Sequence, residues 1–458
     1  MAAGREEDRK KEYEKVLAGS PRLLQAVRRG APAETGTAAL VYSHVLAPGL
    51  GAFVEWLLRK ALNSKKQRLY FLARDGYFMY RAALILCEAY HLPLDCRYLS
   101  CSRYSLRLPL FHLNREGALE HVCRSGVDVT PWKILGRAGL TDNQRQEVLS
   151  ILSLPLRPDE PVPYAALPDI RRRLAECPLF LTYMERHSQD AMPGLSGYLR
   201  QEGLLDAVPY AVVDSGWTGS IQKTLGDALA VLGCSQRPEG YYWGLYELPP
   251  GVKREEYHGY YFEPKGQLRE KIYFNNSLFE ALYTAPHGMT LGYFREGERY
   301  IPRYGFMAEP RKAWIRRNGE LLLSYVRQLT ILSGSAGLAA GNGQAEKNTI
   351  KRLFRLFMAA PSRQEAEIFG SLPFSVDVLE GQEQPLAAPL TEEELKANHA
   401  LPRLLTMAGI RRGHIRESAW YEGSAILYGA NAGQHLRQYA LYQALRFARK
   451  SVRFYRKR

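Results

Sequence analysis

Cysteine is scarce in this sequence and follows no pattern. The chain has six cysteines; no two of them form a C-x-x-C pair, and none stands beside a histidine at zinc-ligand spacing. This excludes a scaffold held by disulfides and a Cys/His zinc module. We therefore expect reduced thiols in a cytoplasmic protein.

Long apolar segments are also missing. The N-terminus, MAAGREEDRKK, is charged and lacks the apolar segment of a signal peptide. No stretch reaches about eighteen uncharged apolar residues, so the sequence predicts no membrane-spanning helix. There is no internal repeat, which argues against a solenoid.

The last sixteen residues contain no acid. From Gln443 onward there are seven basic residues, nearly half of the formal net charge of +15. Apolar residues recur there at helical spacing: Leu441, Leu445, Ala448, Val452 and Tyr455. Such a helix suits an anionic membrane surface, in a protein peripheral to the inner face of the membrane, or equally a packed helix with a solvated face. Nucleic acid is not expected, because no binding module accompanies the charge.

The composition is that of a globular protein. Of 458 residues, 46% are hydrophobic and 24% charged, and the length suits about three structural units. The pattern of elements predicts an N-terminal helix, two halves of an α/β domain, a helical insertion between them and a helical C-terminal region. The corresponding ranges are 1–34, 35–112 with 206–300, 113–205, and 301–458.

Two segments carry most of the functional information. Residues 68–77 (RLYFLARDGY) and 210–220 (YAVVDSGWTGS) are each an apolar run followed by a turn of Asp, Gly and hydroxyl residues and then a helical stretch. Strand, loop and helix in this order predict a doubly wound parallel sheet, Rossmann-like or phosphoribosyltransferase-like, with ligands beyond the carboxyl ends of the strands.

The second loop has the chemistry of a phosphate site. Its glycines allow close backbone approach, and its hydroxyls open a helix whose N–H groups favour an anion. The candidate residues are Ser215, Gly216, Thr218, Gly219 and Ser220, preceded by Asp214, which could bind a sugar hydroxyl or Mg²⁺. The alternative is a plain strand-to-helix turn with Ser220 as the N-cap.

The first loop places Arg74, Asp75 and Gly76 together at a strand end, where Arg74 and Gly76 are candidate phosphate-binding residues. Asp75 is a second candidate ligand for Mg²⁺, although an Asp-Gly turn with solvated charges is the commoner use of this pair. After the next strand, Ser102 and Arg103 could bind a phosphate.

The segment 279–288 (FEALYTAPHG) adds two titratable residues. Glu280, in an apolar helical setting, is a candidate catalytic group together with Asp75 and Asp214. His287 is a weaker candidate, because a histidine in a loop is more often a surface residue.

The order of these loops resembles that of type I phosphoribosyltransferases, whose usual acidic pair is here Asp214-Ser215 in a shorter loop. A closer resemblance covers residues 35–300 and rests on 71–77 (FLARDGY), 101–103 (CSR), 213–222 (VDSGWTGSIQ) and 279–288. These segments look like the C-terminal region of predicted hydrolases of the haloacid dehalogenase superfamily from bacterial surface-polysaccharide loci. Ala73 stands where that superfamily has its nucleophilic Asp, so we expect no phosphatase activity of that type.

The resemblance implies an enzyme of surface-polysaccharide biosynthesis that transfers a glycosyl or phosphoryl group from a phosphorylated sugar or nucleotide-sugar donor, with other glycan-assembly proteins as partners. The alternative is a non-catalytic scaffold of a glycan-assembly complex that keeps the phosphate-binding fold.

Overall fold

The computed structural model describes most of the chain. The described residues are 2–30, 36–124, 129–152, 156–341, 343–374, 384–407, 410 and 415–456, except for the side chains of 2–5, 407 and 451–456.

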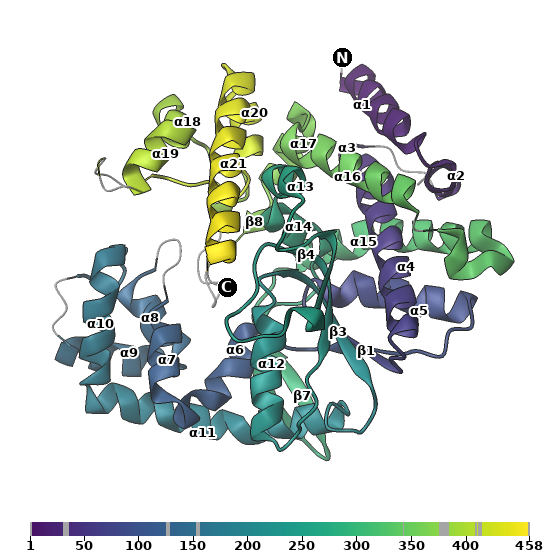
Figure 1. Cartoon of the computed structure of the whole chain (residues 1–458). Helices are drawn as coiled ribbons and strands as arrows, with labels where there is room; N and C mark the ends of the chain where they lie inside the picture. Colours follow the sequence, from purple (N-terminus) through teal and green to yellow (C-terminus); the bar gives the residue numbers. More distant parts are fainter. Residues whose placement is uncertain are drawn as a thin grey trace.

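A five-stranded parallel sheet forms the centre of the molecule (Figure 1). Its order is β2-β1-β3-β4-β5, and every neighbouring pair is parallel. The strands are β1 (Arg68–Leu72), β2 (Asp95–Leu99), β3 (Tyr210–Trp217), β4 (Glu239–Leu245) and β5 (Tyr257–Phe262). This confirms the predicted α/β fold with a doubly wound sheet.

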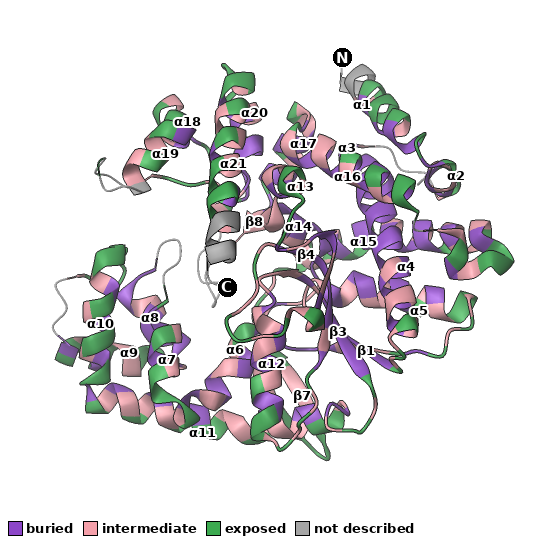
Figure 2. Ribbon diagram, in the orientation of Figure 1, coloured by how far each residue is buried: buried purple, intermediate pink, exposed green. Residues whose placement is uncertain are grey.

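Both faces of the sheet are buried under helices (Figure 2). Alternate residues of β1 point to opposite faces: Leu69 and Phe71 join one hydrophobic cluster, whereas Tyr70 and Leu72 join another. The first face is covered mainly by α4 (Ala47–Asn63), α5 (Gly76–Ala89), α15 (Glu309–Ser333) and α16 (Gln344–Ala359), and the second by α11 (Pro178–Gln201) and α12 (Ser220–Val231). Burial on both sides explains why the strands are continuous apolar runs.

The strand order creates a switch point between β1 and β3. From β1 the chain crosses to β2 on one side, whereas β3 leads to β4 and β5 on the other. The loops that follow β1 and β3 therefore diverge, which is where open α/β sheets bind their ligands.

The region between β2 and β3 is helical, as the sequence indicates. The elements are α6 (Arg103–Arg107), η2 (Leu108–Leu113), α7 (Arg115–Val122), α8 (Pro131–Arg137), α9 (Asp142–Leu152), η3 (Tyr164–Ala166), α10 (Leu167–Ala175) and α11. The helices α7, α8, α9 and α10 form, together with η2, a separate hydrophobic cluster. The long helix α11 contributes residues both to this cluster and to the cluster that covers the sheet.

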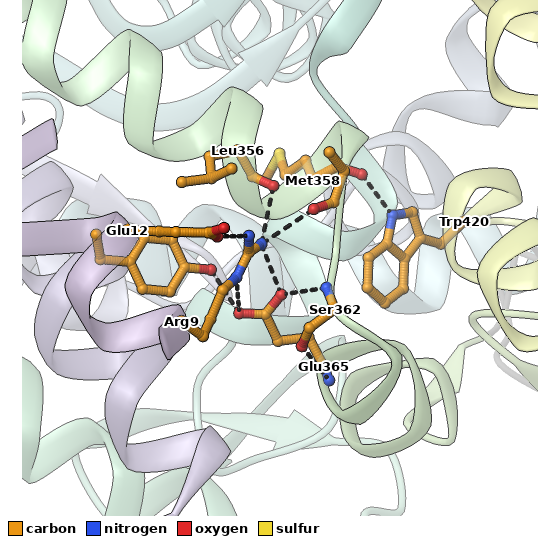
Figure 3. A network of polar contacts seen from close by, with 9 residues as sticks. Arg9, Glu12, Leu356, Met358, Ser362, Glu365 and Trp420 are labelled. Atoms are coloured by element: carbon orange, nitrogen blue, oxygen red, sulfur yellow. Dashed lines mark hydrogen bonds and ion pairs between the residues drawn. The ribbon is translucent and has the colours of Figure 1, made fainter. Parts of the chain in front are cut away.

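At the N-terminus, the single helix expected within residues 1–34 is wrong. The structure has α1 (Ala2–Leu17) and α2 (Pro21–Arg29), because Gly19-Ser20-Pro21 interrupts the backbone hydrogen bonding. Arg9 on α1 donates two hydrogen bonds to the Glu365 carboxylate on α17 (Arg363–Gly370), at 2.8 and 3.0 Å (Figure 3). This pair ties the N-terminus to the C-terminal region.

Among the residues that the structure describes, one helical run is long and apolar enough to cross a membrane, by length and composition alone. It spans Thr37–Asn63 and comprises α3 (Thr37–Val41), η1 (Tyr42–Leu46) and α4. Ser43 and His44 interrupt its apolar character in the sequence, but their side chains are buried and hydrogen-bonded to each other. Since 94% of its most apolar window is buried inside the fold, the run is placed like the core helix of a soluble protein.

The region after β5 is mostly helical, as predicted, and contains a hairpin. A short helix, η4 (Arg254–Glu256), precedes β5. The elements after β5 are α13 (Leu268–Tyr273), α14 (Asn276–Tyr283), β6 (Thr290–Glu296), β7 (Arg299–Tyr304), α15, η5 (Gly334–Ala340), α16, α17, β8 (Pro373–Phe374), β9 (Gln384–Pro385), α18 (Glu392–Ala397), α19 (Ala400–Met407), α20 (Tyr421–Tyr428) and α21 (Ala432–Arg456). α16 and α17 are separate helices, because α16 ends at Ala359 and a capping box of Ser362 and Glu365 starts α17.

The last helix packs through a face that the sequence did not predict. Phe447, 7% exposed, stacks on Tyr246 with ring centroids 5.2 Å apart, and Tyr442 is also buried. Leu441 and Leu445 are instead 49% and 42% exposed. The side chains of Val452 and Tyr455 lie outside those described. The described part of the expected apolar stripe, Leu441, Leu445 and Ala448, faces solvent.

Candidate functional site

The loop after β1 brings Asp75 to the switch point. Asp75 is the residue before α5, and Gly76 opens that helix against the strand. A Cβ on Gly76 would lie 3.0 Å from the carbonyl carbon of Phe71, so the close approach requires glycine. Gly76 thus sets the position of Asp75 at the start of α5. Gly76 itself packs against β1.

The loop after β3 meets the first loop directly. The Ser215 hydroxyl donates a hydrogen bond to the Asp75 carboxylate. β3 stops pairing with β1 at Val213 but continues along β4, where Asp214 lies opposite Tyr242. Asp214 therefore lies inside the strand and not at its end. It belongs to the part of β3 that pairs with β4 but no longer with β1.

Glu280, on α14, is the third acidic side chain of the group. The Trp217 indole Nε1 donates a 2.5 Å hydrogen bond to its carboxylate. Trp217 adopts a left-handed backbone conformation with φ of 66°, which turns the chain from β3 toward α12. The sequence analysis did not single out Trp217; a large aromatic residue between two glycines is the signal that could have identified it.

The three carboxyls are densely surrounded, although each keeps some accessible surface. Burial, and then the charge of Asp75, raise the pKa of Asp214 to about 8. Burial, and then the charge of Asp75, raise the pKa of Glu280 to about 7. Burial also raises the pKa of Asp75, while the Ser215 hydrogen bond and the charges of Arg74 and Arg103 oppose this. The group therefore holds protons near neutral pH, which is typical of catalytic acids and bases.

Arg103 and Arg74 supply positive charge to this group. Both lower the pKa of Asp75 and of Glu280, so both guanidinium groups lie near these carboxyls. Arg103 is the first residue of α6, is exposed, and makes no hydrogen bond or ion pair with any described residue. It is thus available to an anionic ligand.

Ser102 differs from its expected role. Its hydroxyl donates to the Thr290 carbonyl at 2.7 Å and accepts from the Ser105 backbone N–H at 3.0 Å, as the N-cap of α6. These bonds use its proton and satisfy the helix end, so Ser102 positions Arg103 rather than a ligand.

The expected phosphate loop leads into the N-terminus of α12. Gly219, left-handed with φ of 60°, is the N-cap, and Ser220 is the first helical residue, so the alternative of Ser220 as N-cap is wrong. Gly216 also has a positive φ, of 107°. Thr218 donates its backbone N–H to the Gly216 carbonyl at 2.9 Å, so this amide is not free. The first N–H groups of α12, from Ser220 onward, have no partner within the helix and are oriented to bind an anion.

His287 lies close to the site but is held by other groups. Its Nε2 is 2.8 Å from the Tyr98 hydroxyl, and its Nδ1 is 2.8 Å from the Gly288 carbonyl. Burial lowers the pKa of this imidazole. A neutral ring that donates to Gly288 and accepts from Tyr98 fits both contacts, and this is a structural role.

The residues at the switch point fit Mg²⁺ only in part. Among the described residues, no three His, Cys, Asp or Glu side chains are grouped so that they could hold a metal ion. Mg²⁺, however, keeps several waters and is often bound by one or two carboxylates together with a substrate phosphate. Asp75 and Asp214, which influence each other's charge, match that smaller donor set.

Two surface cavities, of about 340 and 430 Å³, lie elsewhere, at α13 and α16. Both are lined by Tyr273, Arg352 and Arg355, and their one acidic residue, Glu270, forms an ion pair with Lys351 at 2.9 Å. They contain no group of interacting carboxyls. The switch point therefore remains the better candidate for catalysis.

No protein-family model and no curated protein matches the chain. The geometry and charge of the site are therefore the observations that bear on its function.

Proposed function

We propose that this protein is an enzyme of bacterial surface-polysaccharide biosynthesis that transfers a glycosyl or phosphoryl group from a phosphorylated sugar or nucleotide-sugar donor. The observation that carries the proposal is the group of Asp75, Asp214 and Glu280 at the switch point of the sheet, beside Arg103 and the N-terminus of α12. Acids that hold protons near pH 7 next to an anion site are the groups that such a transfer requires.

Each side chain has a role that follows from its surroundings. Arg103 and the first N–H groups of α12 neutralise the donor phosphate. Glu280, with a pKa of about 7, can accept the proton of an attacking hydroxyl. Asp214, with a pKa of about 8, is protonated at neutral pH and can donate its proton to the leaving oxygen.

With Mg²⁺ bound, Asp75 and Asp214 would both be ionised and would hold the ion, which would supply charge neutralisation at the phosphate oxygens; Asp214 would then be a ligand and not the acid. Ser215 donates to Asp75 and orients that carboxylate. Trp217 orients Glu280 in the same way.

A thermal-shift screen tests donor binding. Nucleotide sugars, sugar phosphates and phosphoribosyl pyrophosphate are added with and without Mg²⁺. A ligand at one hundred times its Kd stabilises the protein by about 2.7 kcal/mol. We expect the shift to be lost in Arg103→Gln and kept in Arg115→Gln, an exposed arginine on α7 whose ion-pair partner is Glu185. If none of these donors shifts the wild type, the proposal fails.

Turnover separates an enzyme from a scaffold. With the donor identified, Asp214→Asn and Glu280→Gln should each lower kcat by about 10²–10⁴. Asp190→Asn, which changes an exposed carboxylate on α11, is the control. Wild-type turnover in both site variants would contradict the enzymatic proposal and leave the scaffold.

Contact with an anionic membrane is supported by the exposed side of α21. Leu441 and Leu445 lie one turn apart and are exposed, and Arg446 and Arg449 beside them are exposed as well. Apolar and basic side chains together on the outer side of a helix suit an interface with acidic lipid headgroups.

Vesicles of phosphatidylglycerol test this contact. The double variant Leu441→Ser, Leu445→Ser should sediment less with them than the wild type, whereas Leu113→Ser, an exposed leucine of η2, should not change sedimentation. Equal sedimentation of the double variant and the wild type would rule out α21 as the attachment site.

A further inference from the structure

A group of basic side chains extends from Arg103 away from the carboxyls. Arg103 and Arg107 are one turn apart on α6 and lie on the same side of it, while His121 lies in the last turn of α7 and Arg124 follows the end of that helix. α6 packs against α12, the helix whose N-terminus faces the site (Figure 1). We call Arg107, His121 and Arg124 the basic subsite.

Hydrogen bonds hold Arg107 in place. Its Nε donates to the Thr224 hydroxyl on α12 at 3.1 Å, and its Nη1 donates to Nδ1 of His121 at 2.5 Å. Since Nδ1 of His121 is an acceptor, a neutral His121 carries its proton on Nε2. The ring therefore presents a donor, and Nε2 makes no hydrogen bond with a described residue.

The end of α7 is held as well. Arg137 donates to the carbonyls of Val122 and Arg124, at 3.2 and 2.6 Å. The backbone at Arg124 is therefore fixed, while the Arg124 side chain is exposed.

The positive charges of the subsite have no carboxylate partner in the part of the chain that the structure describes. Within the described residues, neither Arg107 nor Arg124 forms an ion pair with a carboxylate. The carboxylate whose charge favours the Arg107 guanidinium is Asp227, and that residue is bonded to Lys223 at 2.8 Å. Burial, and then the charges of Arg103 and Arg124, lower the pKa of Arg107 to about 10. Burial and the surrounding arginines lower the pKa of His121 to about 3.

Such an arrangement is unfavourable without an anion. Buried or half-buried charges in proteins are normally paired, and like charges placed together destabilise the fold. Here the guanidinium groups of Arg103 and Arg124 lie close enough to Arg107 to act on its charge, and Arg103 lies at the proposed phosphate position. A second phosphate next to the first would supply the missing negative charge and accept hydrogen bonds from all three residues.

We propose that Arg107, His121 and Arg124 form a second phosphate subsite, so that the donor carries a diphosphate with one phosphate at Arg103 and the other at the basic subsite. This inference rests on the proposed function, because the first phosphate position is the one assigned there. It narrows the substrate class from any phosphorylated donor to a diphosphate, such as a nucleoside diphosphate sugar or a lipid-linked diphosphate.

Calorimetric titration of the full chain with inorganic phosphate and inorganic pyrophosphate tests the subsite. The wild type should bind pyrophosphate at least about tenfold more tightly than phosphate. Arg107→Gln and Arg124→Gln should lose most of this preference while their affinity for phosphate stays unchanged. Arg115→Gln, on the same helix α7 but paired with Glu185, should keep the preference.

Two variants guard against misfolding. Arg124 is exposed, so Arg124→Gln tests the subsite without disturbing buried contacts. Arg107→Lys keeps the charge and should keep part of the preference. Equal affinities for phosphate and pyrophosphate in the wild type, or a preference that survives in both glutamine variants, would overturn the inference.

The outcomes separate this inference from the proposed function. If phosphate binds and Arg103→Gln abolishes that binding, but pyrophosphate shows no advantage, only the basic subsite is wrong. If neither anion binds, the proposed function fails as well. Uridine diphosphate and farnesyl diphosphate distinguish the two sources of the diphosphate: both should lose affinity in Arg107→Gln, and the one that the wild type binds more tightly identifies the group beyond the phosphates.

Discussion

Two groups of buried charges in this molecule are built in opposite ways. Around Glu365, the carboxylate accepts hydrogen bonds from Arg9, from the Tyr13 hydroxyl at 2.6 Å and from the Ser362 backbone at 2.7 Å (Figure 3). Arg9 also donates to Glu12 and to two backbone carbonyls. Every strong donor and acceptor there has its partner inside the protein.

At the switch point the same kinds of groups are left incomplete. Three carboxyls repel one another, and Asp214 and Glu280 hold protons near neutral pH, while Arg103 and the basic subsite lack carboxylate partners among the described residues. A charge that the fold satisfies contributes to stability, whereas one that it leaves unsatisfied is available for a ligand or a reaction. The contrast identifies which charged residues are structural and which are functional.

Breaking the satisfied group should have the largest effect on stability. Glu365→Gln leaves the buried Arg9 guanidinium without its counter-ion, and we expect a loss of about 3–5 kcal/mol in the free energy of unfolding, measured with urea. The Glu12 side chain is 57% exposed, so Glu12→Gln, the control, should cost less than about 1 kcal/mol. Equal costs in the two variants would contradict the assignment of Glu365 as structural.

The switch-point carboxyls should instead make stability fall with rising pH. A carboxyl with an unfolded pKa of about 4 and a folded pKa of about 8 binds its proton more tightly in the folded state. The free energy of unfolding therefore decreases as the pH rises from about 4 to about 8, by at most about 1.4 kcal/mol per pH unit for each such proton, and changes no further above that range.

Asp214→Asn removes one of these protons. The variant should be less sensitive to pH than the wild type between pH 5 and 8 and at least as stable at pH 8, as urea unfolding at several pH values would measure. Asp190→Asn should follow the wild-type curve. An unchanged pH dependence in Asp214→Asn would show that Asp214 is ionised in the folded protein.

A smaller effect is expected from the indole that orients Glu280. Trp217→Phe removes the hydrogen bond to the carboxylate, which favours its ionised form, so the pKa of Glu280 should rise. The shift can be followed by NMR titration of the carboxyl, with a stability change of about 1 kcal/mol. Trp132→Phe, in α8 of the helical region, should leave the titration unchanged.

Two strands of the sheet and two residues of the site could be predicted from the sequence alone. The apolar runs around Leu69–Leu72 and 210–213 identified β1 and β3, because strands buried on both faces contain little else. Parallel strands end at the same edge, so Asp75 and Asp214 could be expected together. The sequence also contains the signals for the helix breaks at Gly19-Ser20-Pro21 and at Pro361, because glycine and proline interrupt helices.

Other features depend on contacts that no local pattern encodes. The bond from Trp217 to Glu280 joins residues 63 positions apart, and the one from Arg107 to Thr224 joins residues 117 apart. The packed face of α21 was predicted wrongly because Tyr246, the partner that selects Phe447 over the leucines, lies far away in the chain.

The sequence by itself determined the parallel sheet, its two loops at the switch point and the residue types found there, since periodicity and turn chemistry are local properties. Only the tertiary structure decided which charges are satisfied. Glu365 and Glu280 are both glutamates in short helices, and burial against an arginine or against other carboxyls makes one structural and the other titratable near neutral pH. That difference arises from desolvation and distance, which exist only once the chain is folded.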